Sequence, residues 1–522
     1  MEALATVEDI HADIPADAGT EATEDQHQGF SSGPSDPSVL TAYADHVACS
    51  VWTGEERPEL KLSSHGRKVH SLGRPVPAIE GLIVGIGRSP LIACSVDIGD
   101  RGLLSTFVER WHRETSSFHL PVGELTITLD DVSSLLHFPV IGDLHTFEPL
   151  HVDDAIQMLV DLLMVSPESA RAEIVQCCGL YVRLQWIRDI YQRRCQTGHW
   201  TAAARAYLLH LLGCTLFANK SATNVNVVYL EALRDLNMTE RYAWGVAALV
   251  HMYDQLNDAS MSHSRQLGGY ITLLQCWIYE RFPSVAESTA DQDFDEASPH
   301  ACRWIIETKK TVKSIRTLSY RERLDPLRIP DVCWIPYGEH REVQDFHVRS
   351  CYSGPAAVYY RPERVVRQFG YMQTIHAPPV DSRVSYDDIH DRWMHYDDHI
   401  VLASEVCVVS GACSSDYIDW PHIRSSASWS RPVAPSHPSG PADEYPSRAR
   451  ARSIVDICGG AQTCSVCDDI AERLERHLSL GVVTPGSSTH EVIEECLRLT
   501  RSVTQDHLVY VRCRRRRHTD QA

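Results

Sequence analysis

Two pairs of residues in the sequence have the spacing of metal ligands. Asp143 and His145 stand as they do in a two-metal hydrolytic site, but the chain lacks the two further ligand blocks, GD-x-x-DR and GNHE, that complete such a site. Cys464 and Cys467 form a C-x-x-C pair, which is half of a structural zinc site. No second close pair accompanies them. We therefore expect no metal and no other cofactor, and leave zinc at Cys464 and Cys467 as an open alternative.

Two further patterns lack residues that their chemistry requires. Residues 291–295 have alternating aspartates, as a calcium loop does, but Glu296 stands where that loop needs glycine. The run Asn219-Lys220-Ser221 resembles the end of a phosphate-binding loop whose two glycines are missing. No G-x-S-x-G nucleophile elbow occurs, and no Cys/His dyad stands out. We expect no catalytic residue and no enzyme activity.

A cluster of arginines near the end of the chain is the clearest charged patch. Such clusters serve as nuclear import signals or contact the phosphates of nucleic acids. A solvated tail without a role is the alternative. The residues concerned are Arg512, Arg514, Arg515, Arg516 and Arg517.

Composition indicates a folded protein of a reducing compartment. The chain has 522 residues, of which 43% are hydrophobic, and a net charge of −20. Its 17 cysteines have no framework spacing, which favours free thiols. The N-terminus lacks the pattern of a secretory signal, and no run of 18 apolar residues predicts a membrane span. Among the basic residues, six are lysines and 43 are arginines. Arginine suits buried carboxylate pairs, although GC-rich coding DNA would give the same bias.

Local composition divides the chain into five parts. The first 50 residues contain ten acids and neither lysine nor arginine, and such a segment cannot bury enough apolar surface to fold. Five prolines and many serines between residues 425 and 450 predict a linker. We expect a disordered acidic arm at 1–45, a large folded domain at 46–420, a Pro/Ser-rich linker at 421–452, a helical C-terminal module at 453–510 and a basic tail at 511–522.

Hydrophobic periodicity predicts a mainly α fold with minor β pieces. Thr128 and Asp131 form an N-terminal capping pattern for a helix that ends before Pro139, and Ser166 followed by Pro167 starts another. Strands are expected only at 125–128 and 401–409. The remaining predicted helices begin near Asp153 and Tyr181 and span 199–217, 242–259 and 267–282, with a C-terminal helical hairpin formed by 468–480 and 489–500.

One long segment, residues 107–132, resembles the hallmark of the plant mobile domain. The family pattern reads roughly VERW-x-x-ET-x-x-FH-x-P-x-GE-x-T-x-TL-x-DV, and the resemblance extends over about 46–420. The hallmark positions are Glu109, Arg110, Trp111, Glu114, Thr115, Phe118, His119, Pro121, Gly123 and Glu124. Helical spacing predicts two pairs, Glu109 with Arg113 and Arg110 with Glu114. Trp111 and Phe118 are expected to be core anchors.

The resemblance implies a nuclear protein linked to transposable elements, gene silencing and meristem maintenance. Relatives include maintenance-of-meristems-like proteins and long-form homologs of serine/threonine phosphatase 7. It implies a protein partner, either a seven-type phosphatase or a chromatin factor, and no membrane. The alternative is a transposable-element-encoded protein that binds nucleic acid and assists transposition. The family is also called aminotransferase-like, but no lysine here has a pyridoxal phosphate context. The partner's identity and the oligomeric state stay open.

Overall fold

The computed structural model describes most of residues 43–305, 317–337 and 346–375, parts of 393–417, and three positions between 490 and 497. The predicted arm up to residue 42, the linker and the basic tail lie outside the described residues. Of the predicted C-terminal module, only His490, Ile493 and Leu497 are described, and all three are helical. The described part is mainly α with small β pieces, which confirms the predicted fold class.

Helices make up most of the described chain. The α-helices are α1 (Val47–Trp52), α2 (His65–Leu72), α3 (Pro77–Gly85), α4 (Pro90–Ala93), α5 (Arg101–Val108), α6 (Leu129–Leu136), α7 (Val152–Leu163), α8 (Pro167–Cys177), α9 (Leu184–Gln196), α10 (Trp200–Cys214), α11 (Trp244–Ala259), α12 (Ile271–Arg281) and α13 (Thr317–Leu324). The 3-10 helices are η2 (Tyr43–Asp45), η3 (Val227–Leu233), η4 (Thr239–Arg241), η5 (His300–Arg303), η6 (Ile329–Asp331), η7 (Pro362–Arg364) and η8 (Val366–Phe369).

The strands are short and form sheets of two or three strands. The three-stranded sheet is antiparallel, in the order β2 (Trp111–His112), β3 (Ser117–Leu120), β4 (Gly123–Leu125). One pair, β1 (Lys61–Leu62) with β7 (Gln266–Leu267), is parallel. The antiparallel pairs are β5 (Tyr181–Arg183) with β6 (Asn224–Asn226), β8 (Thr289–Ala290) with β9 (Trp304–Ile305), β10 (Phe346–His347) with β13 (Ile400–Val401), and β11 (Arg349–Ser353) with β12 (Ala356–Tyr360).

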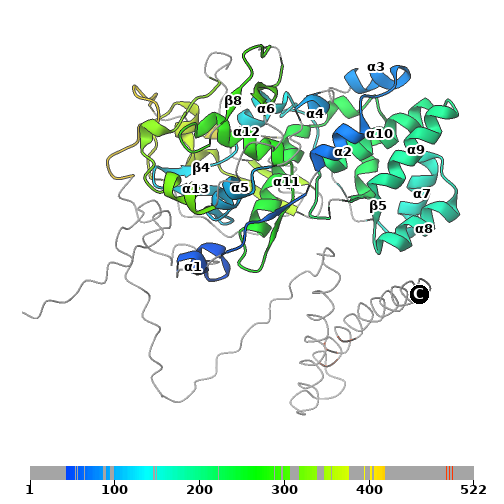
Figure 1. Ribbon diagram of the computed structural model, residues 1–522, viewed down its shortest axis with the longest axis horizontal. Coiled ribbons are helices and arrows are strands. Elements are labelled where there is room, and N and C mark those ends of the chain that lie inside the picture. Colours follow the sequence, from blue (N-terminus) through cyan, green and yellow to red (C-terminus); the bar gives the residue numbers. More distant parts are fainter. Residues whose placement is uncertain are drawn as a thin grey trace, which may run out of the picture.

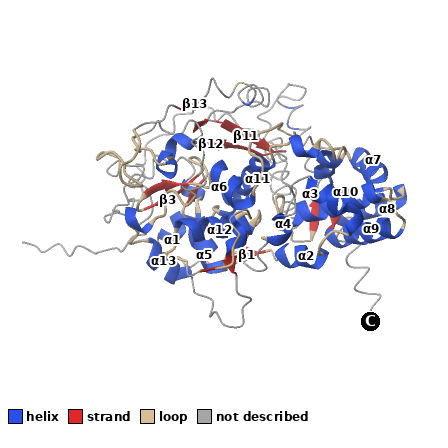
Figure 2. Cartoon of the chain, turned by 90° about the horizontal axis from the view of Figure 1, so that it is seen from above, coloured by secondary structure: helices blue, strands red, loops and turns tan. Residues whose placement is uncertain are grey.

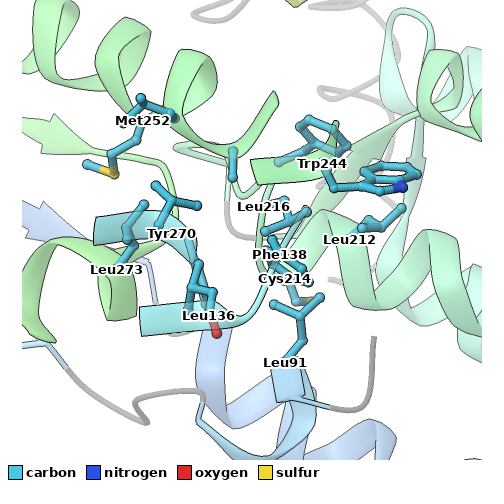
Figure 3. Close-up of a cluster of buried hydrophobic side chains, with 14 of the residues drawn as sticks. Leu91, Leu136, Phe138, Leu212, Cys214, Leu216, Trp244, Met252, Tyr270 and Leu273 are labelled. Atoms are coloured by element: carbon cyan, nitrogen blue, oxygen red, sulfur yellow. The ribbon is translucent and has the colours of Figure 1, made fainter. Parts of the chain in front are cut away.

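The helices gather in two groups that lie side by side. Helices α2, α3 and α7–α10 form one end of the described chain, and α1, α5, α6 and α11–α13 with the three-stranded sheet form the other (Figures 1 and 2). One continuous hydrophobic core joins the two groups. In Figure 3, Leu212 and Cys214 of α10 lie near Trp244 of α11 and Leu136 of α6. The sheet is therefore held on a single, rigidly packed body.

Local sequence signals account for most helix boundaries. Thr128 caps α6: its hydroxyl accepts from the backbone N–H of Asp131, whose carboxylate accepts from the N–H of Thr128. Ser166 caps α8, with Pro167 in its first turn. Helices α10, α11 and α12 lie within the three apolar stretches predicted to be helical, and every residue from 272 to 281 is buried. These predictions are confirmed.

Both predicted strands are mostly wrong. Only Leu125 of 125–128 belongs to a strand, because the backbone at Thr128 already serves as the cap of α6. In 401–409, Val401 ends β13 and residues 402–404 lie outside the described part. Val408 is fully exposed in a bend. A run of β-branched residues there does not pack on the core, so its β propensity does not decide its structure.

Candidate functional site

The hallmark segment forms the three-stranded sheet at the centre of its group of helices. Trp111 pairs with Phe118 across β2 and β3, and Phe118 pairs with Leu125 across β3 and β4. Both rings are fully buried: the Trp111 ring lies 4.9 Å from Phe118 and 4.8 Å from Tyr253 between centroids. Such aromatic contacts add to the free energy gained by burial. The prediction that Trp111 and Phe118 are core anchors is confirmed.

The prediction that Glu109, Arg110, Arg113 and Glu114 share a helix is wrong. Helix α5 ends at Val108, and the chain turns into β2 at Trp111. The charged pair at the turn instead reaches α13 and the residue that follows it. Two nitrogens of Arg321 donate to the carboxylate of Glu109 at 2.8 and 2.7 Å, and Arg110 donates to Asp325 at 2.7 Å. Sequence spacing cannot reveal partners that are more than 200 residues away.

Glu124 of β4 lies at the centre of a second buried ion pair. Its carboxylate accepts from Nε of Arg364 at 2.7 Å, from a second Arg364 nitrogen, and from the Ser117 hydroxyl at 2.7 Å. Glu124 and Arg364 are each 1% exposed. The Ser117 oxygen also lies 2.8 Å from the hydroxyl of Thr115, which in turn lies 3.0 Å from Nε2 of His119. This network attaches η7 to the sheet.

Asp131 combines a helix cap with a third buried ion pair. Its carboxylate accepts from two nitrogens of Arg281 at 3.2 and 2.6 Å, and from the indole N–H of Trp277 at 3.2 Å. Both charged side chains are completely buried. Arg281 also donates to the backbone carbonyl of Trp334 at 2.8 Å. The pair therefore connects α6, α12 and the segment after η6.

Close approach of an arginine explains the glycine of the hallmark. Gly123 has a φ of +107°, and a Cβ built there would collide with the guanidinium of Arg367. That guanidinium is buried between two rings, 4.3 Å from the Trp334 centroid and 5.0 Å from that of Tyr417. It also donates to the carbonyl of Val122 at 2.7 Å. Packing against Arg367 therefore requires glycine at position 123.

Three buried imidazoles lie against one another at the sheet, two of them from its strands β2 and β3. The ring of His112 lies 4.4 Å from that of His46 and 4.3 Å from that of His119. His46 is held on both nitrogens, with Nε2 at 2.7 Å from the carbonyl of Trp111 and Nδ1 accepting from the N–H of Ala48 at 3.0 Å. Burial lowers the pKa of His46 to about 4, and burial with neighbouring His119 and His46 holds the pKa of His112 well below its usual value. His46 and His112 are therefore neutral at pH 7.

We expect acidification to destabilise the protein through buried histidines. Burial lowers the pKa of His46, His65 and His210 to about 4, from 6.5 in an unfolded chain. Between these values the unfolded state binds more protons, so stability present above pH 6.5 is lost as the pH falls towards 4. At pH 5, each of these histidines lowers the free energy of unfolding by about 2 kcal/mol relative to its value at neutral pH. Urea denaturation at pH 7 and pH 5 measures the difference in unfolding free energy that these histidines cause together. The control is the variant His199→Gln at an exposed position, which should show the same difference as the parent protein.

Glu280 opposes part of this effect. Burial raises its pKa to about 7, so its contribution to stability falls as the pH rises from 4.5 to 7. These four groups together contribute an expected loss of roughly 3 kcal/mol between pH 7 and pH 5. Glu280→Gln should increase that loss to roughly 5 kcal/mol. Equal stability at the two pH values in both proteins would contradict neutral burial of the histidines.

We hypothesise that the ion pair of Arg110 with Asp325 fixes the fold or supports partner binding. Its side chain is fully buried, and it also donates to the carbonyl of Thr106 at 2.8 Å. Asp325 is about one-third exposed, so water can hydrate it once the arginine is gone. We expect Arg110→Met to cost about 1–3 kcal/mol of unfolding free energy in urea denaturation. Exposed Arg113→Met should change it by less than about 0.5 kcal/mol. Full solubility with unchanged stability and partner binding would refute the hypothesis.

The other sequence candidates lie apart from the hallmark sheet or outside the described residues. Two of them do lie in the turns of the sheet: Glu114 is half-buried in the turn between β2 and β3, and Pro121 is half-buried in the turn between β3 and β4. Asp143 forms an exposed pair with Arg241 at 3.2 Å, and Lys220 pairs with Asp258. The arginine cluster at 512–517 and the cysteines Cys464 and Cys467 lie outside the described residues, as does His145.

The described part of the chain has neither a metal-binding cluster nor a membrane-spanning helix. No group of three or more His, Cys, Asp or Glu side chains there is placed to hold a metal ion. None of the helices described has the length and apolar character needed to cross a membrane. Sequence reasoning missed the arginines that pair with or pack against the hallmark residues. Three of them are buried, Arg281, Arg364 and Arg367, and the high ratio of arginine to lysine was the signal that could have indicated this.

The sheet, its ion pairs and the surrounding helices define a known class of protein. A family model for the plant mobile domain matches residues 87–422, well over half of the chain. The chain belongs to the plant mobile domain family.

Three Arabidopsis thaliana proteins show the range of its relatives. Protein MAIN-LIKE 1 is 32% identical over 366 residues, which cover 66% of this chain and 68% of that protein. Protein MAINTENANCE OF MERISTEMS is 29% identical over 73% of this chain and 81% of its own length. The serine/threonine-protein phosphatase 7 long form homolog is 28% identical over 66% of this chain but only 27% of its own length. No solved structure matches the chain.

Proposed function

We propose that this protein is a nuclear interaction protein without catalytic activity of its own. In this proposal its plant mobile domain docks a protein partner, either a seven-type serine/threonine phosphatase or a chromatin factor. The process it serves is gene silencing, with a link to transposable elements and meristem maintenance. The name of one relative, Protein MAINTENANCE OF MERISTEMS, supports the last of these links.

The observation that carries the proposal is that three acidic side chains of the hallmark segment are paired with arginines inside the fold. Arg321 binds Glu109, Arg364 binds Glu124 and Arg281 binds Asp131, each with two nitrogens on one carboxylate. An acid or base in catalysis must reach the proton of a substrate. Carboxylates that are 0–1% exposed and doubly bonded to arginine cannot do so. Their arrangement supports a role in holding a scaffold together.

A phosphatase is the favoured partner because of how one relative is built. The phosphatase 7 long form homolog matches this chain over 27% of its length, so most of that protein lies outside the shared segment. A domain that is joined to an enzyme in one chain is a reasonable docking module for a similar enzyme in another. Association as separate chains would need an interface of about 1,200–2,000 Å².

The alternative function is direct nucleic-acid binding by an element-encoded protein, and the arginine cluster Arg512–Arg517 favours it. Neutralising phosphates releases counterions, so such binding weakens steeply with salt. Four arginines that contact phosphates would contribute a slope of roughly −3 to −4 in log K against log salt.

A binding titration with purified full-length protein separates the two functions. Fluorescent duplex DNA, single-stranded DNA and RNA are titrated at several salt concentrations. We expect weak binding at about 150 mM salt, in the range of non-specific complexes or weaker. A variant with Arg514, Arg515, Arg516 and Arg517 changed to alanine is the matched comparison. Tight binding whose salt slope falls by roughly 3 to 4 in this variant would favour the alternative.

A further inference from the structure

A shallow hollow lies at the surface of the protein where α11 begins. Two backbone hydrogen bonds hold its rim: the N–H of Asp143 donates to the carbonyl of Arg241 at 2.7 Å, and the N–H of Ala243 donates to the carbonyl of Asp143 at 3.0 Å. The hollow is therefore built on a fixed backbone. The side chains that matter for binding are those of Asp143, Leu144, Phe147, Tyr242 and Trp244, all of which line it.

Three aromatic side chains give the hollow its character. Phe147 and Trp244 are each 2% exposed, and Trp244 belongs to the buried cluster of Figure 3. Tyr242 is only partly buried, and its ring stands at 80° to that of Trp244 with 6.0 Å between centroids. The enclosed space is about that of one water molecule. It admits the edge of a flat group, but not a leucine or phenylalanine side chain.

The charges around the hollow favour a cation. Asp143 lies 3.2 Å from Arg241, and both side chains are more than half exposed, so this pair is weak and Asp143 can exchange its partner. The arginines of the segment 231–241 are both paired with acids. Asp235 and Glu240 of the same segment are exposed and form no ion pair with any side chain that the structure describes. Two negative charges therefore remain without a counterion.

An anion finds no free donors at the start of α11. The first three N–H groups of this helix already donate to backbone carbonyls at 2.8–3.0 Å. A guanidinium suits the hollow better, because it is flat, weakly hydrated and able to stack on a ring while it binds a carboxylate. The protein already uses this contact elsewhere, where Arg367 lies between the rings of Trp334 and Tyr417.

We propose that the hollow is a docking surface for the chain's own arginine cluster at 512–517. One guanidinium stacks on Tyr242 and binds Asp143, and the charges of Asp235 and Glu240 attract its neighbours. Next to the hollow, Ile141 is 72% exposed and offers apolar surface to the arginine stems. The inference goes beyond the proposed function and does not depend on it.

The length of the intervening chain permits this contact. About 95 residues separate Tyr417 from Arg512. Even a wholly helical segment of that length is roughly 140 Å long. Because the cluster is tethered, a weak contact is enough to keep it bound for much of the time. A docked cluster is shielded from nucleic acid and from import receptors, so the domain would control when the cluster is available.

Peptide binding measures the contact directly. A fluorescent peptide of residues 509–520, with Cys513 replaced by serine, is titrated into full-length protein at about 50 mM salt and followed by anisotropy. We expect saturable binding to a tail variant that has alanine at Arg514, Arg515, Arg516 and Arg517. The parent protein should bind the peptide at least about threefold more weakly, because its own tethered cluster competes.

Variants of the hollow, made in the tail variant, test the mode of binding. Tyr242→Leu removes the ring, and we expect about two- to fivefold weaker binding. Asp143→Asn should weaken binding by up to about fivefold. Glu322→Gln removes one exposed charge from α13, outside the hollow, and should leave binding unchanged. A peptide with lysine in place of every arginine has the same charge but stacks poorly, so it should bind more weakly.

Hydrogen exchange shows whether the cluster occupies the hollow in the intact protein. We expect residues 238–247 to exchange more slowly in the parent protein than in the tail variant. Equal exchange, together with equal peptide binding by the two proteins, would show that the cluster does not dock there. If the lysine peptide binds as well as the arginine peptide and Tyr242→Leu has no effect, the attraction is general charge attraction and the proposal is wrong. The tail changes lie outside the folded domain, so these comparisons do not depend on a variant that fails to fold.

Discussion

Replacing Arg281 with methionine lowers the free energy of unfolding by about 3–5 kcal/mol, which is the usual cost of removing one partner of a buried ion pair. Methionine fills much of the arginine's space, so the loss arises from charge. Asp131 keeps its hydrogen bonds from Thr128 and Trp277 but loses two from the guanidinium, and it has no access to water. Urea denaturation at pH 7, followed by circular dichroism, measures the change.

The double variant Asp131→Asn with Arg281→Met is the matched comparison. It leaves no buried charge at this site, and the amide oxygen of asparagine can still accept the backbone N–H of Thr128. We expect it to recover a large part of the lost stability, because replacing both members of a buried pair is often close to neutral. A single variant within about 1 kcal/mol of the parent protein would show that Arg281 does not stabilise Asp131.

Glu124→Gln should cost about 3 kcal/mol or more, because Arg364 then keeps a buried positive charge without its carboxylate. Glutamine has the same shape and retains an oxygen for the Ser117 hydroxyl, so packing changes little. Since Arg364 attaches η7 to the sheet, the loss should appear locally as well. Hydrogen exchange by mass spectrometry should show faster exchange in residues 360–374.

Exposed Glu322→Gln provides the control for that experiment, with an expected change within about 0.5 kcal/mol. If Glu124→Gln exchanges as the parent protein does in 360–374, the ion pair is not what holds η7 in place. If both variants lose equal stability, the effect is one of net charge and not of the buried pair.

The sequence predicts those features that depend on neighbouring residues. The capping box of α6 involves Thr128 and Asp131, three residues apart, and the apolar stretch of α12 is long enough to favour a buried helix. The hairpin of β2 and β3 was missed for a specific reason. All four residues of β3 are buried, and His112 and Ser116 are buried as well. Polar residues on the inner face hide the alternation that usually predicts a strand.

The ion pairs could not be predicted, because their members are far apart in sequence. Arg281 is 150 residues from Asp131, and Arg364 is 240 residues from Glu124. Composition nevertheless contained a physical signal. Arg110, Arg281, Arg364 and Arg367 are among the largest fully buried side chains. The planar guanidinium can make two parallel hydrogen bonds with one carboxylate or stack on a ring, and lysine can do neither. At Arg281, Arg364 and Arg367, these contacts explain structurally why the residue is arginine.

Affinity purification of the tagged protein from plant nuclei tests the central claim most directly. Bound proteins are identified by mass spectrometry and any bound nucleic acid is sequenced. A stably folded variant, Arg113→Met, serves as the control for tag and surface effects. The account predicts a phosphatase or silencing factor that is recovered reproducibly, without enriched nucleic acid. Element DNA or RNA that is released by moderate salt, with no consistent protein partner, would contradict it.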